Sequence, residues 1–221
     1  MKKCAFLFDF DGVIADSEPL HLETFREILA PLGIKISEER WYREFVGIGS
    51  PRIMKILLGE IGIEDEDVIK SYVEKRRDLF QKRITENKLQ AKNGVKKFLE
   101  ETKKFGIKTA VVSGSHKNNI SLALNILKLE RYFDIIIGRE DYAKNKPDPE
   151  CYLVAAEKLG MKREECLAFE DSIAGCLAAQ NAGMKVIAIE APENVEKYDC
   201  KPIMKIRDFE KLRVEKILEM L

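Results

Sequence analysis

Short apolar runs recur along the chain, and segments with helical periodicity lie between them. Six of the runs have the length of a buried strand, about five to seven residues. They are Cys4–Phe10, Lys108–Ser113, Phe133–Gly138, Cys166–Glu170, Lys185–Glu190 and Pro202–Ile206. Nearly continuous hydrophobicity, as in residues 109–112, is typical of parallel strands that are covered on both faces.

The segments between these runs carry signals for helix starts and stops. Asp148 precedes Pro149 and Glu150, which provides an N-cap, a proline in the first turn and an acid near the positive end of the helix. Gly160 and Gly183 stand where helices should stop. Alternating strands and helices predict an α/β fold with a Rossmann-like doubly wound parallel sheet.

One stretch departs from this alternation. Residues 17–88 have helical periodicity and no convincing strand, with a helix expected to end at Gly33 and another to begin at Ser50. We therefore expect an inserted α-helical cap domain at 17–88. Residues 1–16 and 89–221 are expected to form the Rossmann-like catalytic core, and Phe209–Met220 its last helix.

Composition and charge argue against several binding partners and cellular locations. The 38 basic and 38 acidic side chains cancel, so no global field attracts nucleic acid or an anionic membrane, and we expect neither partner. No apolar run reaches the length of a membrane span, and Asp9 and Asp11 interrupt the first run before a signal-peptide core could form. Five cysteines without a C-x-x-C pair predict reduced thiols. We expect a cytoplasmic protein and a monomer.

Several catalytic motifs are missing from the chain. No cysteine is followed by an arginine six positions later, which excludes the loop of cysteine-based phosphatases. The chain also lacks the G-x-x-x-x-G-K-[ST] loop that binds nucleoside triphosphates and the G-x-G-x-x-G fingerprint that binds dinucleotides.

Polar clusters follow four of the predicted strands, at the edge where open α/β sheets bind their ligands. The clusters are Asp9–Val13, Ser113–Ser115, Lys146–Pro149 and Glu170–Ser172. Each alone is a weak signal, because such residues are common in surface turns. Their occurrence at successive strand ends indicates one shared site.

These residue types suit phosphate chemistry. A carboxylate that approaches a phosphate must overcome repulsion of roughly 4 kcal/mol for unit charges 4 Å apart at a dielectric of 20. Asp9, Glu170 and Asp171 supply the hard oxygens that Mg²⁺ prefers, and Lys146 adds a positive charge. The sequence therefore predicts a site that neutralises a phosphate monoester beside a carboxylate.

Ser113 and the amides of Gly114 and Ser115 are expected to lie where a helix begins, which makes them a natural anion cradle. Gly114 lets the backbone come close to the anion.

The motifs D-F-D-G-V, V-V-S-G-S, K-P-D-P-E and F-E-D-S-I-A-G, in this order, resemble the four motifs of the haloacid dehalogenase superfamily. The inserted helical segment resembles the cap of its β-phosphoglucomutase and sugar-phosphate phosphatase subgroup. The resemblance covers essentially the whole chain.

This resemblance implies a role for each core residue. Asp9 would be the nucleophile that forms an aspartyl-phosphate. Asp11 would protonate the leaving oxygen, activate the accepting water or hydroxyl, and bind the metal through its backbone carbonyl. Asp171 would bind Mg²⁺ together with Asp9, and Glu170 would lie in or just outside the ligand shell. The second aspartate, Asp11, favours cleavage of C–O–P esters over dehalogenation.

Further residues of this pattern are expected to take part. Ser113 and Lys146 would assist catalysis. Contacts with the substrate are expected from Gly12, Gly114, Ser115 and Lys117.

Phosphatases and phosphomutases share all these core residues, so the cap must decide between them. His21 matches a histidine that couples substrate binding to closure in β-phosphoglucomutase, although a simple polar contact on the cap helix explains it equally well. The loop at residues 47–52 resembles the specificity loop of this cap type. Mutases carry an arginine where Ser50 aligns, whereas the nearest arginine here is Arg52. That departure favours a phosphatase, because a bisphosphate needs a clamp for its second phosphate.

Arg76 falls near a mutase lysine on the long cap helix, although a solvated basic patch is an equal alternative. We therefore expect a Mg²⁺-dependent phosphatase of a small phosphorylated metabolite, with Arg52 and Arg76 among its substrate-binding residues. β-Phosphoglucomutase is the alternative, and a catalytically silent phosphometabolite-binding module is a third hypothesis.

Overall fold

The computed structural model describes residues 3–46, 48–86, 88–189 and 200–221. The chain divides into two compact units. One unit ends at Asp16 and resumes at Gln90, and the other comprises Ser17–Leu89. Gly47, in the predicted specificity loop, lies outside the described residues.

The first unit contains a six-stranded sheet with the strand order β5-β4-β1-β6-β7-β8, and every neighbouring pair is parallel. Each strand lies inside one of the six predicted runs, so the predicted Rossmann-like core is confirmed. The strands are β1 Ala5–Phe8, β4 Lys108–Val112, β5 Ile135–Ile137, β6 Cys166–Glu170, β7 Lys185–Ile189 and β8 Met204–Ile206.

The strand order reverses beside β1, because the chain first builds outward through β4 and β5 and then returns to the other side of β1 with β6. The carboxyl ends of β1 and β6 therefore flank the switch point, which is where doubly wound sheets bind ligands.

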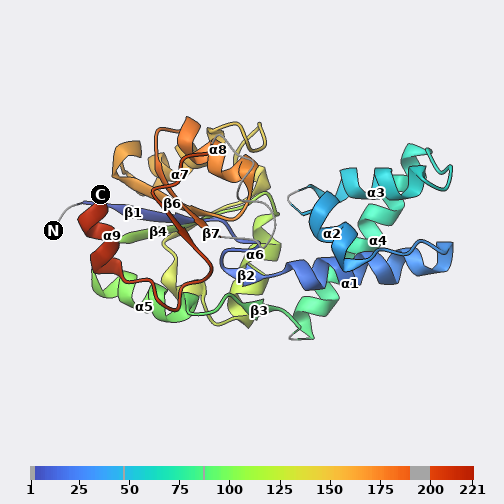
Figure 1. Cartoon of the computed structure of the whole chain (residues 1–221), viewed down its shortest axis with the longest axis horizontal. Helices are drawn as coiled ribbons and strands as arrows, with labels where there is room; N and C mark the ends of the chain where they lie inside the picture. Colours follow the sequence, from blue (N-terminus) through green and yellow to red (C-terminus); the bar gives the residue numbers. More distant parts are fainter. Residues whose placement is uncertain (1–2, 47, 87, 190–199) are drawn as a thin grey trace. The chain divides into compact units, whose positions relative to one another are not determined.

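Helices cover both faces of this sheet (Figure 1). On one face lie α7 Glu150–Leu159 and α8 Ile173–Asn181, and on the other lie α5 Val95–Lys104 and α9 Val214–Met220. Residues of β1 alternate between the faces: Ala5 and Leu7 pack in the cluster under α7 and α8. The rings of Phe6 and Phe8 contact that of Phe98 in α5. Helix α6, Lys117–Ile126, follows β4 and contacts β5.

Two short strands were not predicted. β2 Ala15–Asp16 and β3 Gln90–Ala91 pair antiparallel at the two points where the chain passes between the units. Strands of two residues are too short to produce a detectable alternation of apolar and polar positions.

The second unit consists of helices packed around their own core. They are α1 Glu18–Leu29, α2 Glu38–Glu44, α3 Ser50–Gly59 and α4 Glu66–Thr85. The buried core includes Phe25, Trp41 and Phe45, and the Trp41 Nε1 donates to Glu18 at 2.8 Å. A 3₁₀ turn, Ala30–Leu32, extends α1 to Gly33, whose positive φ of 76° ends it.

Several helix ends differ from the expected positions. Helix α7 begins at Glu150 rather than at Pro149, although Asp148 still accepts a hydrogen bond from the Glu150 amide at 3.0 Å. Gly160 and Gly183 have positive φ where α7 and α8 end, as expected. The last helix begins at Val214 and not at Phe209, because Phe209 instead packs its ring against Phe8 and Phe98. The remaining 3₁₀ turns are Glu130–Tyr132, Arg139–Asp141 and Arg163–Glu165.

All five cysteines are free thiols, as predicted, and only Cys200 is more than slightly exposed. Within the described parts of the chain, no helix combines the length and the apolar character needed to cross a membrane.

Candidate active site

The ends of β1 and β6 bring two carboxylates together. Asp9 follows β1, and its amide still donates to the Phe169 carbonyl of β6 at 3.0 Å. Glu170 is the last residue of β6. Because side chains alternate along a strand, Asp9 lies on the same face as Leu7, and Glu170 on the same face as Ala168, under α7 and α8. The two acids therefore point to one side of the sheet.

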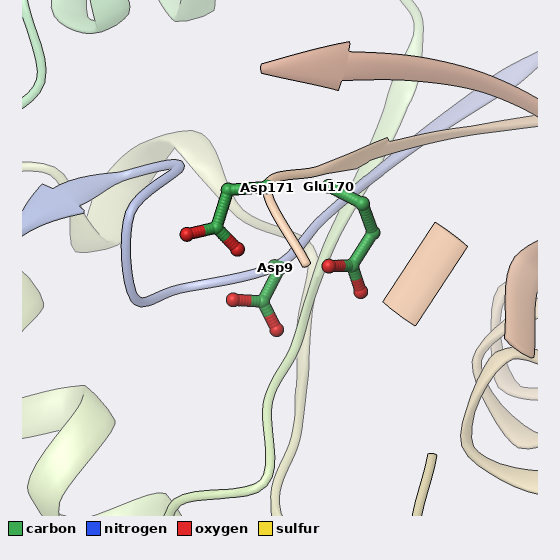
Figure 2. A group of neighbouring side chains, drawn as sticks. All are labelled: Asp9, Glu170 and Asp171. Carbon is green, nitrogen blue, oxygen red and sulfur yellow. The ribbon is translucent and has the colours of Figure 1, made fainter. Parts of the chain in front are cut away.

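Asp171, the next residue, completes an acidic cluster (Figure 2). One carboxylate oxygen from each of Asp9, Glu170 and Asp171 lies within 4.8 Å of the others. Glu170 is fully buried, and Asp9 is 9% exposed. Acids so deeply buried need a positive partner.

Lys146 supplies one positive charge, from the segment between β5 and α7. Its Nζ lies 2.6 Å from Oδ1 of Asp9 and 2.6 Å from Oε1 of Glu170, and it donates to the Val112 carbonyl at 3.1 Å. An ammonium group has three donors, so these contacts account for all of them.

The acidic cluster contains more negative charge than Lys146 can neutralise. Burial raises the pKa of Asp9 to about 8; the Lys146 charge opposes this shift, while Glu170 and Asp11 add to it. Burial lowers the pKa of Lys146, but the charges of Asp9 and Glu170 outweigh it and hold that pKa well above its usual value. One ammonium faces three carboxylates, and a divalent cation would offset the excess.

Two glycines make room for these acids. A Cβ on Gly12 would lie 1.8 Å from Oδ2 of Asp171, and the φ of Gly12 is +73°. A Cβ on Gly175, inside α8, would lie 2.0 Å from Oε2 of Glu170. Only glycine fits at either position without displacing a site carboxylate.

This donor set fits a hard divalent cation. Mg²⁺ prefers hard oxygen ligands, and Asp9, Asp171 and Glu170 each present a carboxylate oxygen. Asp11 lies in the turn after β1 and is close enough to influence Asp9 electrostatically.

Ser113 follows β4 at the same edge of the sheet and is 1% exposed. Its Oγ accepts a hydrogen bond from the Ser115 amide at 3.1 Å, and its carbonyl accepts one from the Tyr142 hydroxyl at 3.1 Å. Gly114 is exposed between them, and a Cβ there would lie 3.9 Å from the Tyr142 hydroxyl oxygen, an ordinary contact distance. The expected cradle is thus a tight turn whose Ser115 amide bonds to the Ser113 side chain.

Helix α6 begins later than expected, at Lys117, so the turn at Ser113–Ser115 precedes the helix. The Lys117 amide contacts the Glu140 carboxylate at 3.3 Å, and Lys117 Nζ donates to Asp141 at 2.8 Å. His116 pairs with Glu140 at 3.1 Å. Glu140 thus accepts from the first amide of α6, and Asp141 accepts from the Lys117 ammonium group.

The cap residues form a separate cluster inside the second unit. Arg76 is 4% exposed and donates from Nε to Thr24 at 3.1 Å and from Nη1 to Ser50 at 3.0 Å. Its Nη2 contacts Nδ1 of His21, whose ring stacks on that of Phe80 at 4.3 Å. Arg52, by contrast, has an exposed side chain.

Two residues of the core site have roles that the sequence did not predict, although Gly175 ends the motif F-E-D-S-I-A-G. Tyr152 donates its buried hydroxyl to Oε1 of Glu170 at 2.5 Å, and Gly175 packs on the same carboxylate. Tyr152 lies in an ordinary apolar helical stretch and gives no signal in the sequence. The packing role of Gly175 could have been predicted, because a glycine inside a helix costs about 1 kcal/mol relative to alanine and therefore calls for a packing reason.

The haloacid dehalogenase-like hydrolase family model matches residues 6–189. A "phosphorylated carbohydrates phosphatase" from Thermotoga maritima is 33% identical over 185 residues, 83% of this chain and 83% of the relative. The structure is similar to β-phosphoglucomutase from Clostridium difficile, with a TM-score of 0.82, 27% identity, and 98% of this chain and 96% of that one covered.

A variant of CbbY from Rhodobacter sphaeroides, solved with xylulose-(1,5)bisphosphate, has a TM-score of 0.81 at 25% identity and covers 94% of this chain and 95% of its own. The matched region contains all four acidic, serine and lysine clusters described above. This chain therefore belongs to the haloacid dehalogenase-like hydrolases.

Proposed function

We propose that this enzyme is a Mg²⁺-dependent phosphatase that hydrolyses a small phosphorylated metabolite, a sugar phosphate, through an aspartyl-phosphate on Asp9. The observation that carries the proposal is the position of Asp9 at the switch point, 2.6 Å from Lys146 and beside Glu170 and Asp171. The phosphatase name of the Thermotoga maritima relative and the sugar bisphosphate bound to CbbY support the substrate class.

In the first step a carboxylate oxygen of Asp9 bonds to phosphorus, and the bond between phosphorus and the ester oxygen breaks. Asp11 gives its proton to the departing alkoxide, so that a neutral alcohol leaves. Ser113 holds the phosphoryl group, since a hydroxyl that accepts one hydrogen bond from Ser115 still has a proton to donate.

In the second step water attacks phosphorus, and Asp11 removes a proton from it. The bond between phosphorus and Asp9 breaks, which releases inorganic phosphate and restores the carboxylate. Lys146 stays on Asp9 throughout and offsets the charge that the phosphoryl oxygens bring. A divalent cation held by Asp9, Asp171, the Asp11 carbonyl and Glu170 would supply further charge neutralisation when bound.

We infer that Gly12, Gly114, Ser115 and Lys117 lie near the phosphate or the rest of the substrate, and that His21, Arg52 and Arg76 contribute from the cap. The expectation of a cytoplasmic monomer rests on the sequence alone.

The alternative is β-phosphoglucomutase, which the similarity to the Clostridium difficile structure favours. In that reaction a sugar hydroxyl replaces water as the acceptor. Ser50 argues against the mutase function, because it stands where the mutases are expected to carry an arginine for the second phosphate. Its hydroxyl instead accepts a hydrogen bond from Arg76.

One assay separates these functions. Purified protein with Mg²⁺ and a panel of sugar phosphates should release inorganic phosphate. A mutase would instead convert β-glucose 1-phosphate, with a trace of the bisphosphate, to glucose 6-phosphate with little free phosphate. No product in either assay would contradict both activities and favour a silent binding module.

A further inference from the structure

Tyr152, in the first turn of α7, contacts Glu170 of the acidic cluster, although nothing in the proposed reaction uses it. Its side chain is fully buried, and its hydroxyl donates to Oε1 of Glu170 at 2.5 Å. The Lys146 Nζ lies 5.2 Å from the centre of its ring. Tyr152 therefore contacts both the buried acid and the ammonium group of the site.

The hydroxyl is held as a proton donor. Burial raises the pKa of Tyr152 well above its usual value, and the Glu170 charge adds to the shift. A carboxylate accepts and cannot donate when it is ionised, so the proton lies on the Tyr152 oxygen and points at Glu170.

The contacts of Glu170 show what this donor does. Oε1 receives both the Tyr152 hydroxyl and the Lys146 ammonium, while Oε2 has the Ser172 hydroxyl at 3.3 Å. Gly175 closes the remaining side, since a Cβ there would overlap the carboxylate. The Glu170 carboxylate is thus fixed in one orientation, and Tyr152 is one of its two donors at Oε1.

The Lys146 Nζ donates to both Asp9 and Glu170, and it lies 2.6 Å from one carboxylate oxygen of each. If the Tyr152 hydroxyl is removed, the Lys146 ammonium is the strong donor that remains at Oε1 of Glu170. Glu170 would then attract Lys146 more strongly and draw its ammonium group away from Asp9. Because opposite charges attract strongly where water is excluded, a small shift of Nζ changes how well Asp9 is neutralised.

We propose that Tyr152 is a positioning residue: its hydroxyl fixes the Glu170 carboxylate and so keeps the Lys146 ammonium on Asp9 and the acidic cluster arranged for a divalent cation. This inference rests on the proposed function for its effect on turnover. Its effect on cation binding is independent of the substrate and of the reaction.

The test compares Tyr152→Phe with the wild type. The variant keeps the ring beside Lys146 and removes only the hydroxyl. Mg²⁺ affinity of the substrate-free protein, measured by calorimetry, should fall about ten- to hundredfold, and kcat on p-nitrophenyl phosphate should fall by a similar factor.

Tyr132→Phe is the matched control. Tyr132 is also a buried tyrosine of the core, and its hydroxyl donates to a carboxylate, Glu100, at 3.0 Å, but it has no contact with the acidic cluster. It should leave Mg²⁺ affinity and kcat as in the wild type.

Equal Mg²⁺ binding by the wild type and Tyr152→Phe, including no binding by either, overturns the inference. A wild type that binds Mg²⁺ but releases no phosphate contradicts the proposed function, while the comparison of affinities still decides the role of Tyr152.

If Tyr152→Phe does not fold, the double variant Tyr152→Phe/Glu170→Gln can be tested in its place. It replaces the buried Glu170 carboxylate, which has lost the hydrogen bond from Tyr152, with a neutral amide. Its Mg²⁺ affinity should match that of Glu170→Gln alone, because Tyr152 acts through Glu170. A further loss in the double variant, or a double variant that also fails to fold while Glu170→Gln folds, would contradict this positioning role.

Discussion

Gly175 of α8 lies against Glu170 of β6 so closely that a Cβ on the glycine would come within 2.0 Å of the carboxylate. Because Gly175 has no side chain, the backbone of α8 can pack directly against the Glu170 carboxylate and hold it in place. This contact makes a position with no functional group of its own necessary for the arrangement of Glu170, Lys146 and Asp9.

Gly175→Ala should displace the Glu170 carboxylate and lower kcat/KM on p-nitrophenyl phosphate about ten- to hundredfold. The added methyl group should also cost about 1–3 kcal/mol of unfolding free energy, measured in urea. Gly59→Ala is the control, since Gly59 is also helical but has open space at its Cα. Unchanged activity in Gly175→Ala would mean that the position of Glu170 does not matter for turnover.

Asp9→Asn should lower turnover by more than about a thousandfold, because it removes the nucleophile while conserving volume. Phosphate release with Mg²⁺ measures this, and circular dichroism should be unchanged. Asp78→Asn, at an exposed cap residue, should behave as the wild type. Appreciable turnover by Asp9→Asn would assign the nucleophile to another residue.

Removing Mg²⁺ with a chelator should abolish phosphate release, and adding it back should restore the activity. Mg²⁺ should also raise the unfolding midpoint, since a ligand at a hundredfold of its Kd stabilises by about 2.7 kcal/mol. Asp171→Asn should lose most of this stabilisation. An equal shift in Asp171→Asn and the wild type would place the cation elsewhere.

Asp141 should make the core sensitive to acid. Burial by itself would raise its pKa, but hydrogen bonds from Lys117, Lys158 and the Gly138 amide outweigh it and lower the pKa from 3.8 to about 2. A depressed pKa stabilises the folded state above pH 3.8, and this stabilisation is lost as the pH falls from about 4 through about 2.

Asp141→Asn should therefore lower the unfolding free energy at pH 7 by about 1 kcal/mol, after allowance for solvent screening. The difference from the wild type should shrink as the pH approaches 2. Urea titrations across this range measure it, and a difference that grows in acid would contradict the assignment.

The two cap arginines should respond differently to truncation. Arg76→Ala leaves a cavity and removes the hydrogen bonds that Arg76 donates to the Thr24 and Ser50 hydroxyls, and should cost about 2 kcal/mol of unfolding free energy. Arg52→Ala, at an exposed site, should cost less than about 0.5 kcal/mol.

Both variants should change the kcat/KM for a sugar phosphate more than that for p-nitrophenyl phosphate. Equal losses on the large and the small ester would argue against recognition of the substrate by these residues.

The sequence was sufficient for the strands of the sheet and for the four polar clusters. A strand covered on both faces must be almost continuously apolar, so β1, β4 and β6 are visible as runs, and the polar residues that end them are conspicuous. The sequence did not reveal the short β2–β3 pair or the true start of α9, because neither depends on a local pattern.

Only the tertiary structure decided which atoms meet. Asp9 and Lys146 are 137 positions apart, and they form a pair because the segment after β5 reaches across the end of β4, where Lys146 also contacts the Val112 carbonyl, to the end of β1. The bond from Tyr152 to Glu170 and the fit of Gly175 depend on how α7 and α8 pack on the sheet. Local sequence determines how each segment folds and which chemical groups it carries, whereas distances between segments follow from the packing of the whole core.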